Sequence, residues 1–202
     1  MHTERGLDRL VTFLDAVVAI AITLLVLPLI ELLGERQDGD DLGSLLGDHL
    51  VDFGAFALSF VVIARLWLVH HKLVESVGRY DAAFTWLSLL WAFTIVFLPF
   101  ATQVIADFGT DRLAVALYMG TMTLSSLTST LLFVLVHRSA VLRRPGVAAA
   151  DVPLVPAFVT TGLLVLALVL GVAFRSVNFY ALLLLFLGGP VEALVGRLDR
   201  RG

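Results

Sequence analysis

Six long apolar runs divide this sequence of 202 residues, and each is long enough to cross a lipid bilayer. Each run has about 19 to 25 residues, which as an α-helix would extend about 28 to 38 Å, against a hydrocarbon core of roughly 30 Å. The runs lack the alternation of polar and apolar residues that a barrel strand needs. The sequence therefore predicts an all-α integral membrane protein, with residues 1–202 forming a single six-span membrane domain. The predicted spans are approximately 10–33, 50–69, 82–106, 113–136, 152–174 and 177–195.

The composition supports a membrane protein and excludes several other classes. Hydrophobic residues make up 59% of the chain and charged residues 15%, and the mean hydropathy is +0.96, too apolar for a soluble domain to cover its core with charge. Because cysteine is absent, disulfides and cysteine-ligated metal sites are excluded. The formal charge of -3 and the scattered arginines argue against a nucleic-acid partner.

The basic residues predict the orientation in the membrane. Arg5 and Arg9 precede the first run as in a signal peptide, but this run is too long for one and ends in IELLGE, so we expect a retained span. Only Arg36, Arg112 and Arg175 would lie on the side of the acidic loop. Cytoplasmic loops are enriched in Lys and Arg, so the sequence predicts cytoplasmic termini and an external loop. The opposite side would hold Arg5, Arg9, Arg65, Lys72, Arg79, Arg138, Arg143, Arg144, Arg197, Arg200 and Arg201.

Asp15 is an ionisable residue inside the first predicted span, where a charge needs a partner or water. One interpretation is a carboxylate held by hydrogen-bonding neighbours that joins helix ends; the other is direct contact with a permeating ion or proton. Adjacent histidines point about 100° apart on a helix, so the pair in the second span does not predict a metal or haem site. The candidate partners at matching depth in that span are Arg65, Trp67, His70 and His71.

Thr23 is the single hydroxyl residue in the central part of the first span. With Ala16, Ile20 and Leu27 it forms a 4-3-4 spacing that draws one stripe along a helix. Every face of this helix is apolar, so the spacing alone does not show that the stripe is functional. A buried threonine can instead bond a carbonyl of its own preceding turn. The sequence leaves both a packing role and a pore-lining role open.

Other polar and proline residues in the spans have structural interpretations. Thr121, Ser125 and Ser129 share one face of the fourth span, which favours a small-residue packing face, with a polar conduit as the alternative. Pro28 and Pro99 are predicted to bend or end their helices. The sequence contains no glycine-rich phosphate loop, zinc-binding helix or serine nucleophile with partners, so we expect neither an enzyme nor a cofactor.

The first span carries a motif that resembles a known family. Arg9-x-x-x-Phe13-Leu14-Asp15, followed by AVVAIAITLLVL, resembles the first-helix signature of the transmembrane protein 175 family, potassium-permeable channels of endolysosomal and prokaryotic membranes. The family pattern has Ser where this chain has Leu14. LWLVHH in the second span and RYDAAFTWLSLLWAFTIVFLPFATQVI in the third also resemble family segments. The last three spans match only in length and topology.

The resemblance implies a bacterial potassium channel in the plasma membrane that assembles as a homotetramer of six-span subunits. Its pore would be lined by the first helix, without the TVGYG filter of other potassium channels. Ile20 would form the hydrophobic constriction, Thr23 a hydroxyl ring and Leu27 a second narrow ring. Its partners would be further copies of the chain, membrane lipid and monovalent cations. Such a filter replaces little of an ion's hydration shell, so we expect a leak-type channel with modest selectivity for potassium over sodium.

The resemblance also implies a network at the cytoplasmic side that holds the pore helix, in which Leu14 cannot donate the hydrogen bond of the family's Ser. Two other functions remain alternatives: a proton-coupled secondary transporter that uses Asp15 and the histidines, and a non-transporting membrane scaffold. The implied network contains Arg9, Phe13, Asp15, Trp67 and His70 or His71.

Overall fold

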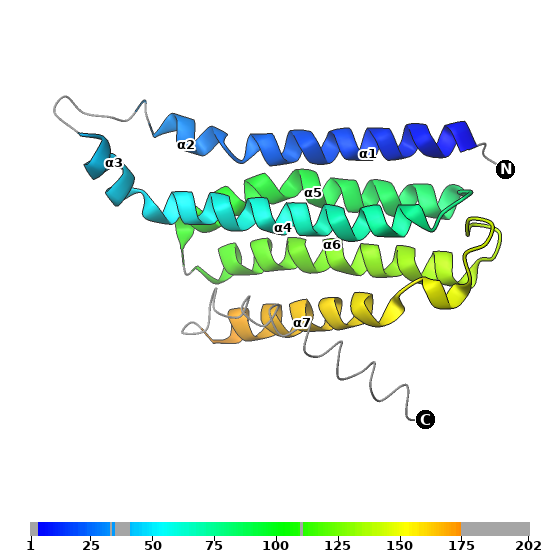
Figure 1. Cartoon of the computed structure of the whole chain (residues 1–202). Coiled ribbons are helices and arrows are strands. Elements are labelled where there is room, and N and C mark those ends of the chain that lie inside the picture. The colour runs from blue at the N-terminus through cyan, green and yellow to red at the C-terminus, as the bar shows by residue number, and fades with distance from the viewer. Residues whose placement is uncertain (1–3, 33, 35–40, 110, 175–202) are drawn as a thin grey trace.

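The structure is a computed structural model that describes residues 4–32, 34, 41–109 and 111–174, and this part of the chain is all-α (Figure 1). Among these described residues, five stretches are long and apolar enough to cross a membrane: Arg5–Glu31, Leu50–Glu75, Ala82–Phe108, Arg112–Arg138 and Ala149–Ala173. The predicted sixth span, 177–195, lies outside the described residues. The helices are α1 (Glu4–Leu24), α2 (Leu27–Glu31), α3 (Leu42–Asp48), α4 (Leu50–Glu75), α5 (Ala82–Phe108), α6 (Arg112–Arg138), the 3-10 helix η1 (Ala149–Asp151) and α7 (Leu154–Ala173).

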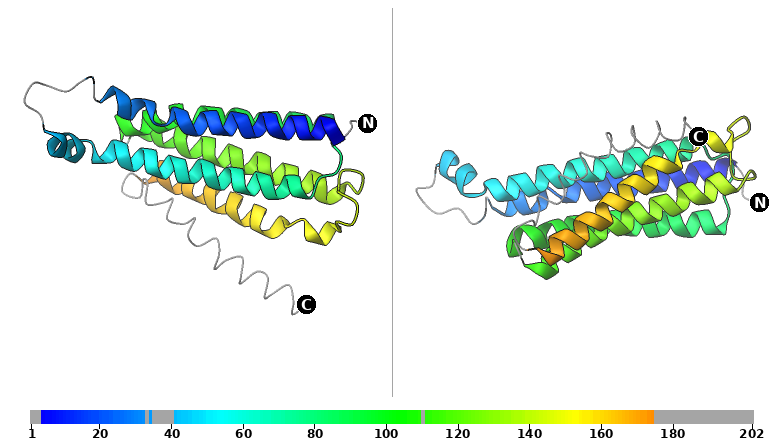
Figure 2. Two further views of the ribbon diagram at one scale, coloured as in Figure 1. Left: turned by 45° about the horizontal axis from the view of Figure 1, so that its top comes forward. Right: turned by 90° about the horizontal axis from the view of Figure 1, so that it is seen from below.

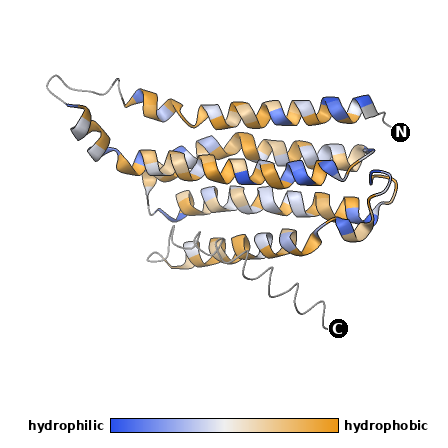
Figure 3. Ribbon diagram, viewed as in Figure 1, coloured by the Kyte–Doolittle hydropathy of each residue, from blue (hydrophilic) through white to orange (hydrophobic). Residues whose placement is uncertain are grey.

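The long helices lie side by side in layers. In Figures 1 and 2, α1 forms one edge of the bundle, α4 and α5 lie beside each other beneath it, and α6 and then α7 follow. α5 is the central helix, since it packs against α6, α1 and α4. Hydrophobic residues cover the length of the bundle (Figure 3). In the described part of the chain, α1 therefore has neighbouring helices on one of its sides only.

Aspartates begin three of the helices. Asp81 accepts a hydrogen bond from the backbone N–H of Phe84 (2.8 Å), and Asp111 accepts one from that of Leu113 (2.8 Å). Asp41 caps α3 in the same way, and its bonds from Ser44 hold the pKa of the carboxyl below its usual value. Capping supplies acceptors for N–H groups that have no partner within the helix. These caps set where α3, α5 and α6 begin.

The two prolines behave differently. Pro28 follows the end of α1 and begins the short α2, so the first span is interrupted as predicted. Pro99, by contrast, lies inside α5, which continues to Phe108, so of the two predicted outcomes, a bend or an end, the helix end is wrong. α5 is packed along its length by three other helices, and such packing tolerates the missing hydrogen bond of a proline within a membrane helix.

Gly78 lies where two connecting segments meet at the end of the bundle that holds the start of α1. Its N–H donates to the carbonyl of Leu142 (2.9 Å), and a Cβ added to it would lie 2.8 Å from the Cα of Arg144. We expect Gly78→Ala to destabilise the fold by about 1 to 3 kcal/mol, because this backbone contact must open. Thermal unfolding in detergent measures the loss. Gly162→Ala is the matched control, since a Cβ there meets nothing within 4 Å, and an equal Tm for both variants would contradict the prediction.

Candidate pore-lining surface and cytoplasmic-side cluster

α1 has one packed face and one bare face. Leu14, Val18 and Ala21 are buried in the main core of the bundle, with Leu14 only 1% exposed. Ile20 is 60% exposed although it is a large apolar residue near the middle of the span. The exposed residues at the predicted spacing, which we call the α1 stripe, are Ala16, Ile20, Thr23 and Leu27.

Thr23 uses its hydroxyl hydrogen locally while its side chain remains exposed. Its Oγ1 donates to the carbonyl oxygen of Ile20 at 2.8 Å. The donor is therefore occupied, and the oxygen lone pairs remain available on the exposed side. Because Thr23 is exposed, it has no packing role, and the local bond orients an oxygen that can still accept a hydrogen bond or coordinate a cation.

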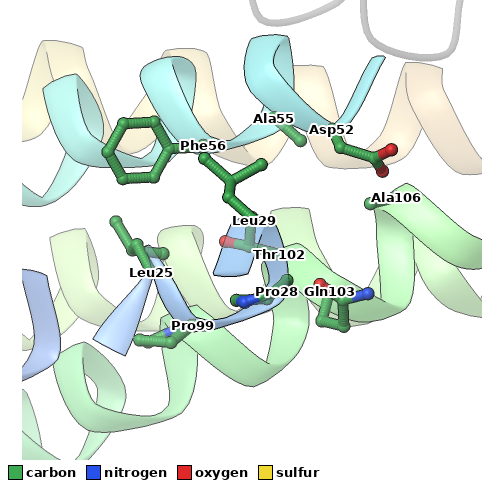
Figure 4. A pocket seen from close by; sticks show the side chains of 10 residues that line it. All are labelled: Leu25, Pro28, Leu29, Asp52, Ala55, Phe56, Pro99, Thr102, Gln103 and Ala106. Atoms are coloured by element: carbon green, nitrogen blue, oxygen red, sulfur yellow. The ribbon is translucent and has the colours of Figure 1, made fainter. Parts of the chain in front are cut away.

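The outer part of the α1 stripe lies at a break in the helix. The N–H groups of Leu25 and Val26 donate to the carbonyls three residues earlier, at 3.3 Å each, so the last turn of α1 is tightened. Behind the break is a cavity of about 20 Å³, enough for about one water molecule. Figure 4 shows its walls, which come from the break, α4 and α5 and include the polar residues Asp52, Thr102 and Gln103. Leu27 therefore lies in a segment backed by a small gap with polar walls.

Three buried hydroxyls join the helices next to this cavity. Thr102 Oγ1 donates to Ser59 Oγ (2.8 Å), which lies 3.1 Å from the hydroxyl oxygen of Tyr118. The three residues come from α5, α4 and α6, and all are buried. These three residues were not predicted from the sequence as members of the site. Each is a hydroxyl residue within an apolar run, which is a signal that the sequence contains. The spacing along the chain does not show which of these hydroxyls form hydrogen bonds with one another.

Asp15 is bonded to the second long span. The indole N–H of Trp67 donates to Asp15 Oδ1 at 2.8 Å, and the carboxyl is half-buried. His71 lies next to this bond, with its ring centroid 5.1 Å from that of Trp67. Its Nε2 is also 3.8 Å from Glu75 Oε1. The structure thus brings Asp15, Trp67 and His71 together at one end of the bundle.

The other candidates of this network lie elsewhere. His70 is 3% exposed and stacks on Trp91 of α5, with centroids 4.0 Å apart and planes at 10°, so it belongs to the packing between α4 and α5. Arg9 and Phe13 are exposed on the bare side of α1. Arg65 is exposed on α4, and within the described part of the chain it has no hydrogen bond or ion pair. Leu14, which replaces the family's Ser, fills an apolar site in the core.

The hydroxyls of α6 pack inside the protein. Thr121, Ser125 and Ser129 are all buried, as the packing interpretation requires. Nearby, Thr161 of α7 bonds both Ser126 (2.7 Å) and Thr130 (2.8 Å). Among the residues that the structure describes, no group of three or more His, Cys, Asp or Glu side chains could hold a metal ion.

Comparison with known proteins agrees with this arrangement. Residues 9–99, which include most of α1, all of α4 and most of α5, match the family described as endosomal/lysosomal potassium channel TMEM175. A crystal structure of a lysosomal potassium-selective channel TMEM175 homolog from Chamaesiphon minutus aligns with a TM-score of 0.68 and 26% identity, covering 93% of this chain and 96% of that one. Residues 9–99 are thus similar to the TMEM175 family, and the fold of the chain resembles that of the Chamaesiphon minutus homolog.

Curated relatives carry channel names. A potassium channel of Streptomyces collinus is 35% identical over 101 residues, which is 50% of this chain and 48% of that protein. A potassium channel of Chamaesiphon minutus is 34% identical over 122 residues, 59% of either chain. The human endosomal/lysosomal proton channel TMEM175 is 27% identical over 113 residues, 55% of this chain and 22% of the human one. The chain thus matches about half the length of these bacterial relatives.

Proposed function

We propose that this chain is a member of the TMEM175 family and a potassium-permeable, leak-type cation channel whose pore is lined by α1 in a homotetramer. The observation that carries the proposal is the bare α1 stripe, which leaves Ile20 60% exposed opposite a fully packed face. An apolar stripe of this kind can face other copies of itself around an axis. The names of the bacterial relatives support potassium as the permeating ion.

The α1 stripe supplies the parts that such a pore needs. Symmetry converts each residue of the stripe into a ring, so Ile20 and Leu27 would form apolar constrictions and Thr23 a ring of four hydroxyl oxygens. An apolar ring can restrict ions by excluding water, without a charged plug. The oxygen lone pairs of Thr23 would face a partly hydrated cation. No cofactor takes part in this function.

We further propose that the whole chain is one six-span unit, completed by residues 177–195, in the plasma membrane of a bacterium. Arg5, Lys72, Arg79 and Arg138 lie at the ends of helices that meet at one end of the bundle (Figure 1). The excess of basic residues at this end supports a cytoplasmic location of both termini.

The cluster of Asp15, Trp67 and His71, at the proposed cytoplasmic side, would hold the pore helix at the correct distance from the axis of the tetramer. The bond between Asp15 and Trp67 fixes α1 to α4, and His71 flanks it. His70 would contribute by fixing α4 to α5 through Trp91. Arg9 and Phe13, exposed in a single chain, would be covered by neighbouring copies in the assembled channel.

Thr23→Ala tests the proposed function most directly. In planar bilayers with potassium on one side and sodium on the other, we expect the permeability ratio to fall about threefold, or about 0.6 kcal/mol of differential stabilisation. Thr23→Ser keeps the oxygen and is expected to retain the ratio. An unchanged ratio in Thr23→Ala would remove Thr23 from the pore.

The same recordings separate the alternatives. A channel produces unitary currents that need no proton gradient, whereas a proton-coupled transporter produces fluxes that depend on one. A scaffold produces neither. Because the animal relatives are named proton channels, reversal potentials under a pH gradient should be measured alongside those for potassium and sodium.

A further inference from the structure

Arg65 is a charged residue on the outward face of a membrane span. α4 runs from Leu50 to Glu75, so Arg65 lies ten residues, or about 15 Å, from the nearer end of the helix. The buried residues Ile63, His70 and Leu73 lie on the opposite face of α4. A guanidinium within a span is costly in lipid unless it has polar or aromatic partners or reaches the membrane interface. The described residues of its own chain supply none.

Contacts between α4 and α5 fix the depth of Arg65. Ser59 bonds Thr102, and eleven residues further along α4 His70 stacks on Trp91, eleven residues back along α5. Arg65 follows Ser59 by six residues and is therefore level with Val96. Copies related by rotation about the membrane normal keep the same depth, so Arg65 of one copy meets this level of the next.

A groove between α5 and α6 opens at that level, and we call it the α5–α6 groove. It has a volume of about 340 Å³, and its lining includes Phe93, Phe97, Gly120, Thr121 and Leu124. The two phenylalanine rings lie 6.2 Å apart between centroids, and Phe93 is 61% exposed. Thr121 donates its hydroxyl hydrogen to the carbonyl of Leu117 (2.7 Å), which leaves its lone pairs free to accept.

The chemistry of the groove suits a guanidinium. An arginine side chain carries N–H donors and no acceptor, and its planar head stacks favourably on aromatic rings. Phe93 and Phe97 supply aromatic rings to the lining, Thr121 is its hydroxyl residue, and a Cβ on Gly120 would meet no atom within 4 Å. A cation held over aromatic rings away from water is attracted more strongly than one at an exposed site.

The two surfaces lie on opposite sides of the subunit. In Figures 1 and 2, α4 and α5 lie on either side of the layer beneath α1. We infer that Arg65 of one copy inserts into the α5–α6 groove of the next, and that this head-to-tail contact closes the ring of subunits around the α1 stripe. A contact between unlike surfaces closes into a ring when the rotation between copies permits it. The inference rests on the proposed function and names the interface that the pore requires.

Cysteine cross-linking tests this interface, because the chain contains no cysteine of its own. Full-length protein carrying both Arg65→Cys and Leu124→Cys is oxidised with copper phenanthroline in vesicles and separated on a denaturing gel. We expect a ladder of covalent dimers, trimers and tetramers. Either single variant is expected to give no ladder, since a head-to-tail contact does not bring like positions together. The control pair Arg65→Cys with Leu113→Cys places the second thiol at the far, outer end of α6 and should also give none.

Native mass spectrometry of Arg65→Leu and Arg65→Lys gives a second measurement. We expect Arg65→Leu to weaken association about tenfold and Arg65→Lys to weaken it less, because the cation is kept. If the single variant Arg65→Cys formed cross-linked dimers without a second cysteine, the contact would join like surfaces, and this result would overturn the inference. Tetramers that conduct potassium but show no ladder would overturn it too, while the proposed function would stand. A monomer that conducts nothing would instead contradict the proposed function.

Discussion

Ile20→Asn is expected to raise the potassium conductance of the reconstituted protein by about tenfold or more. Ile20 is the most exposed large apolar residue of the α1 stripe, so four copies would form the narrowest dry section of the proposed pore. Asparagine is of similar length but holds water, which lowers the barrier to ion entry. A barrier lowered by about 1.4 kcal/mol already changes a rate tenfold. Single-channel recording in symmetrical potassium solutions measures this increase.

Two control variants make the Ile20 test specific. Ile20→Leu keeps an apolar ring of the same volume, which excludes water in the same way, and is expected to conduct within about twofold of the native protein. Val169→Asn places the same polar group on the exposed face of α7, away from α1, and should leave conductance unchanged. If Ile20→Asn and Val169→Asn gave equal currents, Ile20 would not line the pore.

Asp15→Ala is expected to destabilise the protein by about 1 to 2 kcal/mol. The change removes the acceptor of the Trp67 indole N–H, now bonded at 2.8 Å, and leaves a partly buried donor without a partner. Unsatisfied buried donors cost about 1 to 3 kcal/mol, although hydrogen bonds between membrane helices average about 0.6 kcal/mol in double-mutant cycles. Thermal unfolding in detergent checks the loss.

A double-mutant cycle with Trp67→Phe isolates the bond between Asp15 and Trp67. Once Trp67 has lost its N–H, Asp15→Ala should cost measurably less than it does in the native protein. Asp15→Asn keeps an acceptor oxygen at the same position and is expected to recover most of the stability. Equal losses for Asp15→Ala in both backgrounds would show that the carboxylate acts through another partner.

Much of the candidate site was predictable from local sequence. The α1 stripe follows from helical spacing, and the exposure of Ile20, Thr23 and Leu27 agrees with that spacing. Trp67 was a predicted partner of Asp15 because both lie at one depth in adjacent antiparallel spans. Both inferences rely on helix geometry, which is the same for every sequence that forms a helix.

Pairings between side chains on different helices were not predictable in the same way. His70 and His71 are adjacent and chemically equal, yet one is buried against Trp91 and the other lies beside Trp67, because the rotation of α4 decides which faces inward. Pro99 was expected to bend or end its helix, and the helix does not end there, because the helices packed around α5 keep it continuous. The contact of Thr102 with Ser59 likewise joins residues 43 positions apart.

The sequence by itself determined that this is an all-α membrane protein, because runs of about 20 apolar residues in lipid must satisfy their own backbone hydrogen bonds. It also determined the residue types along the α1 stripe. Only the tertiary structure decided which side of α1 stays bare and where Arg65 and the α5–α6 groove lie relative to each other. Every face of these spans is apolar, so hydropathy cannot distinguish a buried face from a lipid-facing one, and packing against neighbouring helices makes the choice.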